Sequence, residues 1–246
     1  MNSYRADLHI HTVLSPCGDL EMSPGKIVAK AAEKGLDMIA VTDHNHCGHA
    51  HLARELGARR GIWVVYGAEI TTREEVHCLT FFDTDEQLSL FQQELDGNLT
   101  KIPNDTSFMG HQVIVDEREQ IVKEVRHSLY PGLNWVIEEA AAVVHRLGGL
   151  FVPAHVDRFM NGLYSQLGFF PAGLKADAIE ISRRSSPQEV AGKHPELNAY
   201  TLIQNSDAHY LNDIGRAGNN YRMKNRNFEE FRLALRGEEG RSVLEL

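Results

Sequence analysis

The feature that most constrains this chain is a D-x-H-x-H pattern at residues 7–11. Because successive side chains of an extended strand point to opposite faces, Asp7, His9 and His11 are expected on one face. At about 3.3 Å of rise per residue, the two histidines lie about 7 Å apart along the strand, which suits one metal ion or two neighbouring ones. The alternative is a surface strand with incidental histidines, so the decision depends on ligands from other segments.

Composition limits the class of protein. The chain has 246 residues, 42% of them hydrophobic, and no run approaching the ~18 apolar residues of a membrane span. The first residues do not resemble a signal peptide, and the three cysteines form no C-x-x-C pair, so a cytoplasmic protein with reduced thiols and no membrane partner is expected. The net charge of −9 argues against a protein that binds extended nucleic acid through a broad basic face, but not against a small phosphorylated substrate.

Strand and helix patterns alternate along most of the chain. One helix is predicted to begin at Pro24, with Ser23 as its N-cap, and to end at Gly35. The other helices are predicted at residues 49–60, 86–95, 133–147 and 228–236, and strands at 5–10, 36–41, 62–69, 76–82, 150–154, 178–182 and 200–204. This order indicates a single domain, residues 1–246, around a mainly parallel sheet that is closed or nearly closed.

Residues 97–131 interrupt the alternation. Gly, Asn, Pro and Asp are frequent at the start, and two β-rich arms follow at 112–115 and 120–125. This pattern predicts an insertion that contains a hairpin. Three roles are compatible with it: a cover over the active site, a dimer contact, or a structural flap without a catalytic role.

The metal-ligand candidates share one position, at or just beyond the C-terminal end of a predicted strand. They are His9, His11, His44, Glu69, His155, Asp207 and His209. His77 is the exception, because it lies near the start of a strand. In parallel α/β barrels the active site forms at this rim. A helix cap, a solvated carboxylate or a turn could explain single members, but their common placement favours a metal site.

The motifs, taken in order, resemble those of the PHP (polymerase and histidinol phosphatase) superfamily, and most closely its stand-alone metal-dependent phosphoesterases. The matching segments are residues 7–11 (DLHIH), 42–44 (TDH), 67–69 (GAE) followed by His77, 153–155 (PAH) and 206–209 (SDAH). The resemblance implies a distorted (β/α)7 barrel with two or three divalent metal ions at the C-terminal rim. Mn, Fe and Zn all remain open as the metal.

The resemblance also implies ligand sets. One metal would be bound by His9, His11, Glu69 and Asp207, which are thus catalytic through the metals, and a second by Glu69, His77 and His155. Glu69 would bridge the two ions. A third metal would be bound by His44, His209 and a residue of the loop after His11.

Two residues compete for that loop position, Cys17 and Asp19. We favour Asp19, because a carboxylate suits Mn, Fe or Zn among nitrogen and oxygen ligands, whereas a thiolate favours softer metals. Asp7 and Asp43 are expected to orient the ligand imidazoles rather than to bind metal.

The expected activity is hydrolysis of a small phosphomonoester or nucleotide by a metal-activated water. Arg158 and Arg183, which follow predicted strands, are candidates to bind the substrate phosphate; the alternative for each is a surface salt bridge. Other functions left open are a histidinol-phosphate phosphatase, an exonuclease on short nucleic acid, and a regulatory metal-binding module without turnover. Residue patterns leave the natural substrate, the general acid and the oligomeric state undecided.

Overall fold

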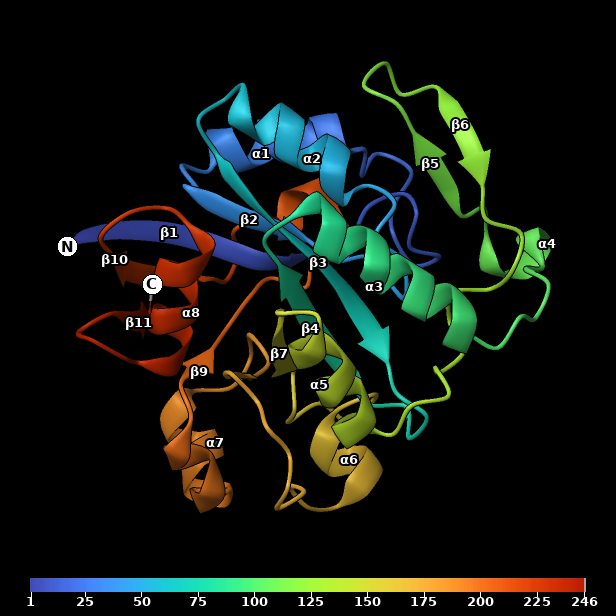
Figure 1. Ribbon diagram of the computed structural model, residues 1–246. Coiled ribbons are helices and arrows are strands. Elements are labelled where there is room, and N and C mark those ends of the chain that lie inside the picture. Colours follow the sequence, from blue (N-terminus) through green and yellow to red (C-terminus); the bar gives the residue numbers. More distant parts are fainter. Residues whose placement is uncertain (246) are drawn as a thin grey trace.

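The chain folds around a curled seven-stranded sheet, seen in a computed structural model that describes residues 1–245 (Figure 1). In spatial order its strands are β11 (Ser242–Glu245), β10 (Asn219–Met223), β1 (Asn2–Ile10), β2 (Met38–Val41), β3 (Trp63–Thr71), β4 (His77–Phe82) and β7 (Leu150–Pro153). A separate parallel pair consists of β8 (Ile179–Glu180) and β9 (Leu202–Ile203). Backbone hydrogen bonds join Val156 to Glu180 and Ala208 to His9, so this pair bridges the ends of β7 and β1.

The prediction of a mainly parallel sheet is only partly correct. Strands β1, β2 and β3 are parallel, but β4 is antiparallel to both β3 and β7, and β10 is antiparallel to both β1 and β11. Only residues 72–76 separate β3 from β4, which is too short for the crossover that a parallel pair requires. Thr71 therefore pairs with His77, and the start of β4 lies at the same rim as the end of β3. This arrangement explains the apparent exception of His77.

Helices cover the sheet and close one end of it. The outer helices α1 (Pro24–Glu33) and α2 (Ala50–Ala58) contact each other, and the Ser23 hydroxyl caps α1 as predicted. Helix α8 (Phe228–Arg236) coincides with its prediction, and its Phe231 packs against Trp63, Phe81 and Tyr221. Because Trp63 begins β3, α8 closes the end opposite the rim where the candidate ligands lie.

Other helices differ more from prediction. α3 (Asp85–Asn98) forms as expected, but α5 (Ile137–Arg146) begins later than residue 133. The residues before it hydrogen-bond to the β3–β4 connection instead, through the pairs Leu133–Thr71 and Arg73–Trp135. The short helices α4 (Thr106–Met109), α6 (Leu163–Leu167) and α7 (Pro187–Lys193), the 3-10 turns Pro195–Ala199 and Leu211–Asp213, and strands β10 and β11 were not predicted.

The insertion contains the predicted hairpin, formed by β5 (Val113–Val115) and β6 (Ile121–Glu124). It extends away from the main sheet in Figure 1. The buried His49 anchors it, because its Nε2 accepts a hydrogen bond from the Val115 backbone at 2.9 Å. Within residues 1–245, none of the helices combines the length and the apolar character needed to cross a membrane.

Candidate metal centre

The buried carboxylate of Glu69, near the end of β3, lies at the centre of the site. It is 1% exposed, and five imidazoles approach it. The nitrogen–oxygen distances are 3.0 Å for His77, 3.1 Å for His44, 3.1 Å for His155, 3.2 Å for His9 and 3.4 Å for His11. Burial raises the pKa of Glu69, but the neighbouring imidazoles of His77, His9 and His44 outweigh it and hold the pKa well below its usual value. Glu69 is therefore an ionised carboxylate with several nitrogen donors around it.

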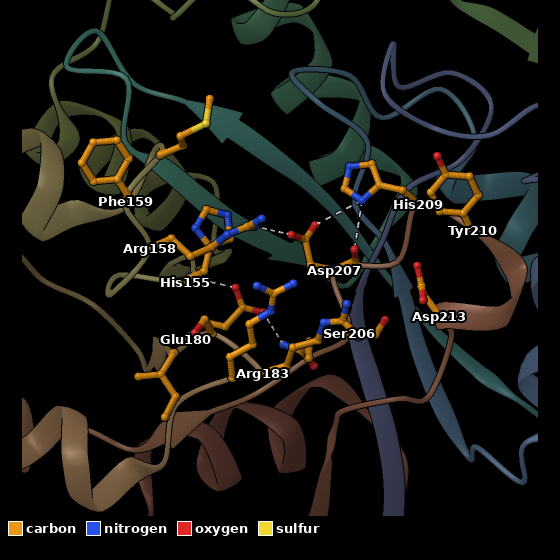
Figure 2. A pocket seen from close by; sticks show the side chains of 15 residues that line it. His155, Arg158, Phe159, Glu180, Arg183, Ser206, Asp207, His209, Tyr210 and Asp213 are labelled. Carbon is orange, nitrogen blue, oxygen red and sulfur yellow. Dashed lines mark hydrogen bonds and ion pairs between the residues drawn. The ribbon is translucent and has the colours of Figure 1, made fainter.

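A second carboxylate, Asp207, faces the same histidines from the segment after β9. Its Oδ1 lies 3.4 Å from His9 Nε2 and 3.3 Å from His11 Nε2. Its other oxygen accepts a hydrogen bond from Arg158, as Figure 2 shows. Asp207 has a φ of 51° and His155 one of 31°, a left-handed backbone that is uncommon for residues other than glycine. Such strain is characteristic of functional sites.

The donor set fits divalent cations. Three groups have ligand atoms that all lie within 4.8 Å of one another: His9, His11 and Glu69; His44, Glu69 and His77; and His11, Cys17, His44 and His209. His155 Nδ1 is buried and lacks a hydrogen-bond partner among the described residues. Although burial lowers the pKa of His9, the carboxylates of Glu180, Glu69 and Asp207 raise it well above its usual value, so a cation is favoured at this position. Imidazole and carboxylate ligands suit Mn, Fe and Zn.

Glu180, in β8, orients two of the histidines. Its carboxylate accepts hydrogen bonds from His9 Nδ1 at 3.1 Å, from the His155 backbone N–H at 3.0 Å and from the Asn205 side chain at 2.8 Å. With Nδ1 donating to Glu180, Nε2 of His9 is left to face Glu69 and Asp207, as in many metal sites. Glu180 is not among the residues predicted from the sequence. The sequence feature that could have indicated it is a carboxylate between two isoleucines, Ile179 and Ile181, in a short apolar segment.

His11 is oriented through a relay. The Ser15 hydroxyl donates to Asp43 at 2.7 Å and lies 3.0 Å from His11 Nδ1, so Nδ1 carries the proton and Nε2 faces the centre. Burial, followed by the neighbouring His209, lowers the pKa of His11 to about 4, which keeps the ring neutral and able to bind metal. Asp43 therefore supports a ligand imidazole, as expected, but through Ser15.

Asp7 has a supporting position, as expected, but the expectation that it orients an imidazole was wrong. Asp7 accepts hydrogen bonds from the backbone N–H groups of Ser206 and Gly215, so it holds the loop that carries Asp207 rather than an imidazole ring. The β1–β2 register is irregular between residues 7 and 10, and Leu8 and Ile10 pack in different core clusters. This irregularity breaks the strict alternation on which the prediction depended.

Cys17, rather than Asp19, joins the third group of ligands. Cys17 Sγ lies 3.0 Å from His209 Nε2, and it belongs to the group with His11, His44 and His209. The Asp19 carboxylate instead accepts a hydrogen bond from the Glu21 backbone and belongs to none of the three groups. The prediction favoured Asp19 from ligand chemistry alone and lacked the turn geometry that directs the two side chains.

The end of the insertion borders this group. The Asn45 side chain donates to the backbone carbonyls of Leu129 and Pro131, which fixes the return of the insertion beside the rim. The ring of Tyr130 lies 6.1 Å from that of His44. The returning chain thus forms one wall of the candidate site, while the hairpin projects away from it.

Comparison with known proteins identifies the family. The family model described as "PHP domain" matches residues 7–130, which is half of the chain. The chain belongs to the PHP domain family. Within that match lie six of the candidate ligands, His9, His11, Cys17, His44, Glu69 and His77.

Several relatives of this PHP chain are longer than it is. The uncharacterised protein YqxK of Bacillus subtilis is 26% identical over 99% of the chain and 65% of its own length. The endonuclease PfuEndoQ of Pyrococcus furiosus has a TM-score of 0.78 at 23% identity, over 98% of this chain and 58% of that one. A structure of Endonuclease Q with a 27-mer duplex that carries an abasic lesion at the active site gives a TM-score of 0.73 at 22% identity. The chain thus spans less than two thirds of these relatives, and the structural likeness shows the fold alone.

A smaller relative matches over most of its length. A Bifidobacterium adolescentis protein, described as a candidate metal-dependent phosphoesterase, has a TM-score of 0.54 at 22% identity, over 84% of this chain and 88% of that one.

Beside the candidate ligands of this PHP domain lies an open cavity of about 500 Å³ (Figure 2). Arg158 and Arg183 both line it, together with His155, Asp207 and His209. Arg183 belongs to the loop after β8, which is held by Asp157: its carboxylate accepts hydrogen bonds from the Ser182 backbone at 2.7 Å and the Ser182 hydroxyl at 2.8 Å. The structure therefore brings both arginines to the rim; their contact with substrate stays a prediction.

Proposed function

We propose that this chain is a metal-dependent phosphoesterase that hydrolyses a phosphate ester at the rim around Glu69. The observation that carries the proposal is a buried, ionised carboxylate with five imidazole nitrogens within 3.4 Å. We assign His9, His11, Glu69 and Asp207 to one ion and Glu69, His77 and His155 to a second, on a distorted (β/α)7 barrel. Bound divalent ions supply a nucleophilic water at neutral pH and positive charge for the phosphoryl oxygens.

The chain's own residues prepare the site for that chemistry. Glu180 and Ser15 fix the imidazole tautomers, so that Nε2 of His9 and of His11 points to the centre. Arg158 offers its guanidinium at the boundary between Asp207 and the cavity, and Arg183 adds a second cationic group. Planar guanidinium groups match the oxygens of a phosphate ester, so these two side chains would bind and orient the phosphoryl group.

A small phosphomonoester or nucleotide is the first candidate substrate. The cavity of about 500 Å³ falls in the range of small-molecule sites. The net charge of −9 disfavours a broad nucleic-acid surface.

A phosphodiester within nucleic acid is the second candidate, and a specific observation favours it. Phe159 and Met160, next to Arg158 at the edge of the cavity, are 91% and 71% exposed, and Tyr210 on the other side is 58% exposed. Exposed aromatic rings beside cationic groups suit stacking with nucleobases. The likeness to Endonuclease Q points in the same direction.

A substrate panel tests the proposal and separates the two candidates. The chelator-treated chain is reconstituted with Mn²⁺, Fe²⁺ or Zn²⁺ and assayed with histidinol phosphate, mononucleotides, short single strands and a duplex with an abasic site. We expect metal-dependent turnover that Asp207→Ala abolishes and that the surface control Glu229→Ala retains. Tight metal binding without turnover of any substrate would instead support a regulatory metal-binding module.

A further inference from the structure

The third group of candidate ligands contains a sulfur atom. Cys17 Sγ lies 3.0 Å from His209 Nε2, and its ligand atom lies within 4.8 Å of those of His11, His44 and His209. The other two cysteines, Cys47 and Cys78, are buried in the apolar core. Cys17 is thus the cysteine that the fold directs toward the metal centre.

The backbone of the loop enforces this position. The Gly18 N–H donates to Ser15, and the Asp19 N–H donates to the carbonyl of His209 at 3.0 Å, which ties the loop to the segment that carries the other ligand. A Cβ atom on Gly18 would lie only 2.1 Å from the Thr12 carbonyl oxygen. Only glycine fits this close approach, and the resulting turn places the Cys17 sulfur beside the His209 ring.

His11 is engaged elsewhere, although it also belongs to this group. Its Nδ1 contacts Ser15, so one nitrogen remains, and that Nε2 faces Glu69 at 3.4 Å and Asp207 at 3.3 Å. A single nitrogen binds one ion, so His11 is assigned to the ion beside Glu69 and Asp207. Cys17 and His209 belong to this group alone, and His44, whose Nδ1 lies 3.1 Å from Glu69, is shared with the group around Glu69 and His77. Three protein ligands leave a position open for water or substrate, as in catalytic zinc sites.

We propose that Cys17 supplies a thiolate to a third metal position, with His44 and His209, and that this position selects zinc over manganese. The inference rests on the metal-binding part of the proposed function. A thiolate is a soft ligand that suits Zn²⁺, whereas Mn²⁺ prefers oxygen ligands. Binding exchanges the thiol proton for the metal: the sulfur–hydrogen bond breaks, a sulfur–metal bond forms with the same electron pair, and one proton passes to solvent.

Cobalt substitution tests the thiolate directly. The whole chain is stripped of metal and titrated with Co²⁺, which reports a thiolate ligand through a sulfur-to-cobalt charge-transfer band. We expect the band in the unmodified chain and in the control Cys47→Ala, and its complete loss in Cys17→Ser and Cys17→Asp. Cys17→Asp should still bind the third ion, which separates loss of sulfur from loss of the site.

Two results would overturn the proposal: no charge-transfer band in the unmodified chain at full cobalt occupancy, or a band that persists in Cys17→Ser. If the variants do not fold, X-ray absorption at the zinc edge of the unmodified chain decides, because it detects or excludes a sulfur neighbour. The readout is independent of turnover. A band in a chain that hydrolyses no phosphate ester would support the thiolate ligand and contradict the phosphoesterase activity. Turnover without a band would support the activity and contradict the thiolate ligand.

Discussion

The Oε2 atom of Glu180 lies 3.1 Å from Nδ1 of His9. The same carboxylate accepts from the His155 backbone and from Asn205, whose own oxygen accepts from the Leu8 backbone at 2.8 Å. One side chain of β8 therefore connects three segments that carry ligands. Because this network fixes the orientation of the His9 ring, its loss should affect metal affinity first.

Replacing Glu180 with Gln should lower metal affinity by about 10–100-fold, the usual cost of losing a partner of a ligand histidine. Oε2 of Glu180 accepts from His9 and from the His155 backbone, and Oε1 accepts from Asn205, so the NH2 group of a glutamine would face at least one of these donors. Competition with a chelating dye measures the affinity, with the exposed Glu189→Gln as the control. An unchanged affinity would show that Glu180 does not orient the ligands.

Replacing Asp157 with Ala should raise KM with little change in kcat. The variant loses the hydrogen bonds from Ser182 and frees the loop that carries Arg183, at a cost of about 1–3 kcal/mol in substrate binding. Steady-state kinetics with the best substrate of the panel provide the measurement. A fall in kcat at constant KM would place Asp157 in the chemical step instead.

Replacing Arg183 with Ala should raise KM by about tenfold or more, because a charge-assisted hydrogen bond to phosphate is worth about 1.5–3 kcal/mol. Arg183→Lys should recover only part of the loss, since an ammonium group lacks the planar fork. The surface variant Arg59→Ala serves as control. If Arg183→Ala and Arg183→Lys had the same KM as Arg59→Ala, Arg183 would have no role in substrate binding.

His49 should make stability depend on pH. Its Nδ1 contacts Thr12 and its Nε2 accepts from Val115, which requires a neutral ring, and burial lowers its pKa from 6.5 to about 4. Between these values the unfolded chain binds a proton that the folded chain does not, so stability is lost as the pH falls from about 6.5 to 4.

Denaturant unfolding across that pH range measures the effect. The free energy of unfolding of the unmodified chain should fall by about 2–3 kcal/mol more than that of His49→Gln, because the glutamine at position 49 does not titrate. Parallel pH profiles for the two chains would contradict the role assigned to His49.

Most of the site was predictable because its members share a position in the pattern of strands. His9 and Glu69 lie near the ends of strands, and Asp207 follows one. The apolar character of these strands is visible in the sequence, and the resemblance to the family implies how the ligands are grouped. Cys17 and Asp19 are equivalent by sequence, and only the turn at Gly18 distinguishes them. Glu180 was missed because its role depends on contacts with β1 and β7, which are distant in sequence.

The fold was predictable in its elements but less so in its topology. Helix α8 coincides with its prediction, since its capping and amphipathic patterns are local. The antiparallel direction of β4 follows from the short connection of residues 72–76, whereas the alternating order of strands and helices favours parallel strands. Strands β10 and β11 were not predicted. β10 carries polar residues, Asn219 and Arg222 among them, so it lacks an apolar strand pattern and is defined by its backbone pairing with β1 and β11.

The proposed function requires the carboxylate of Glu69 to hold the divalent ions that make phosphate-ester hydrolysis possible. Its most direct test is the hydrolysis rate of p-nitrophenyl phosphate and its diester by chelator-stripped chain as Mn²⁺, Fe²⁺ or Zn²⁺ is added back, for the unmodified chain and for Glu69→Gln. We expect turnover that appears with metal in the unmodified chain and is lost in the variant. Equal metal-dependent rates in the two chains would contradict this expectation.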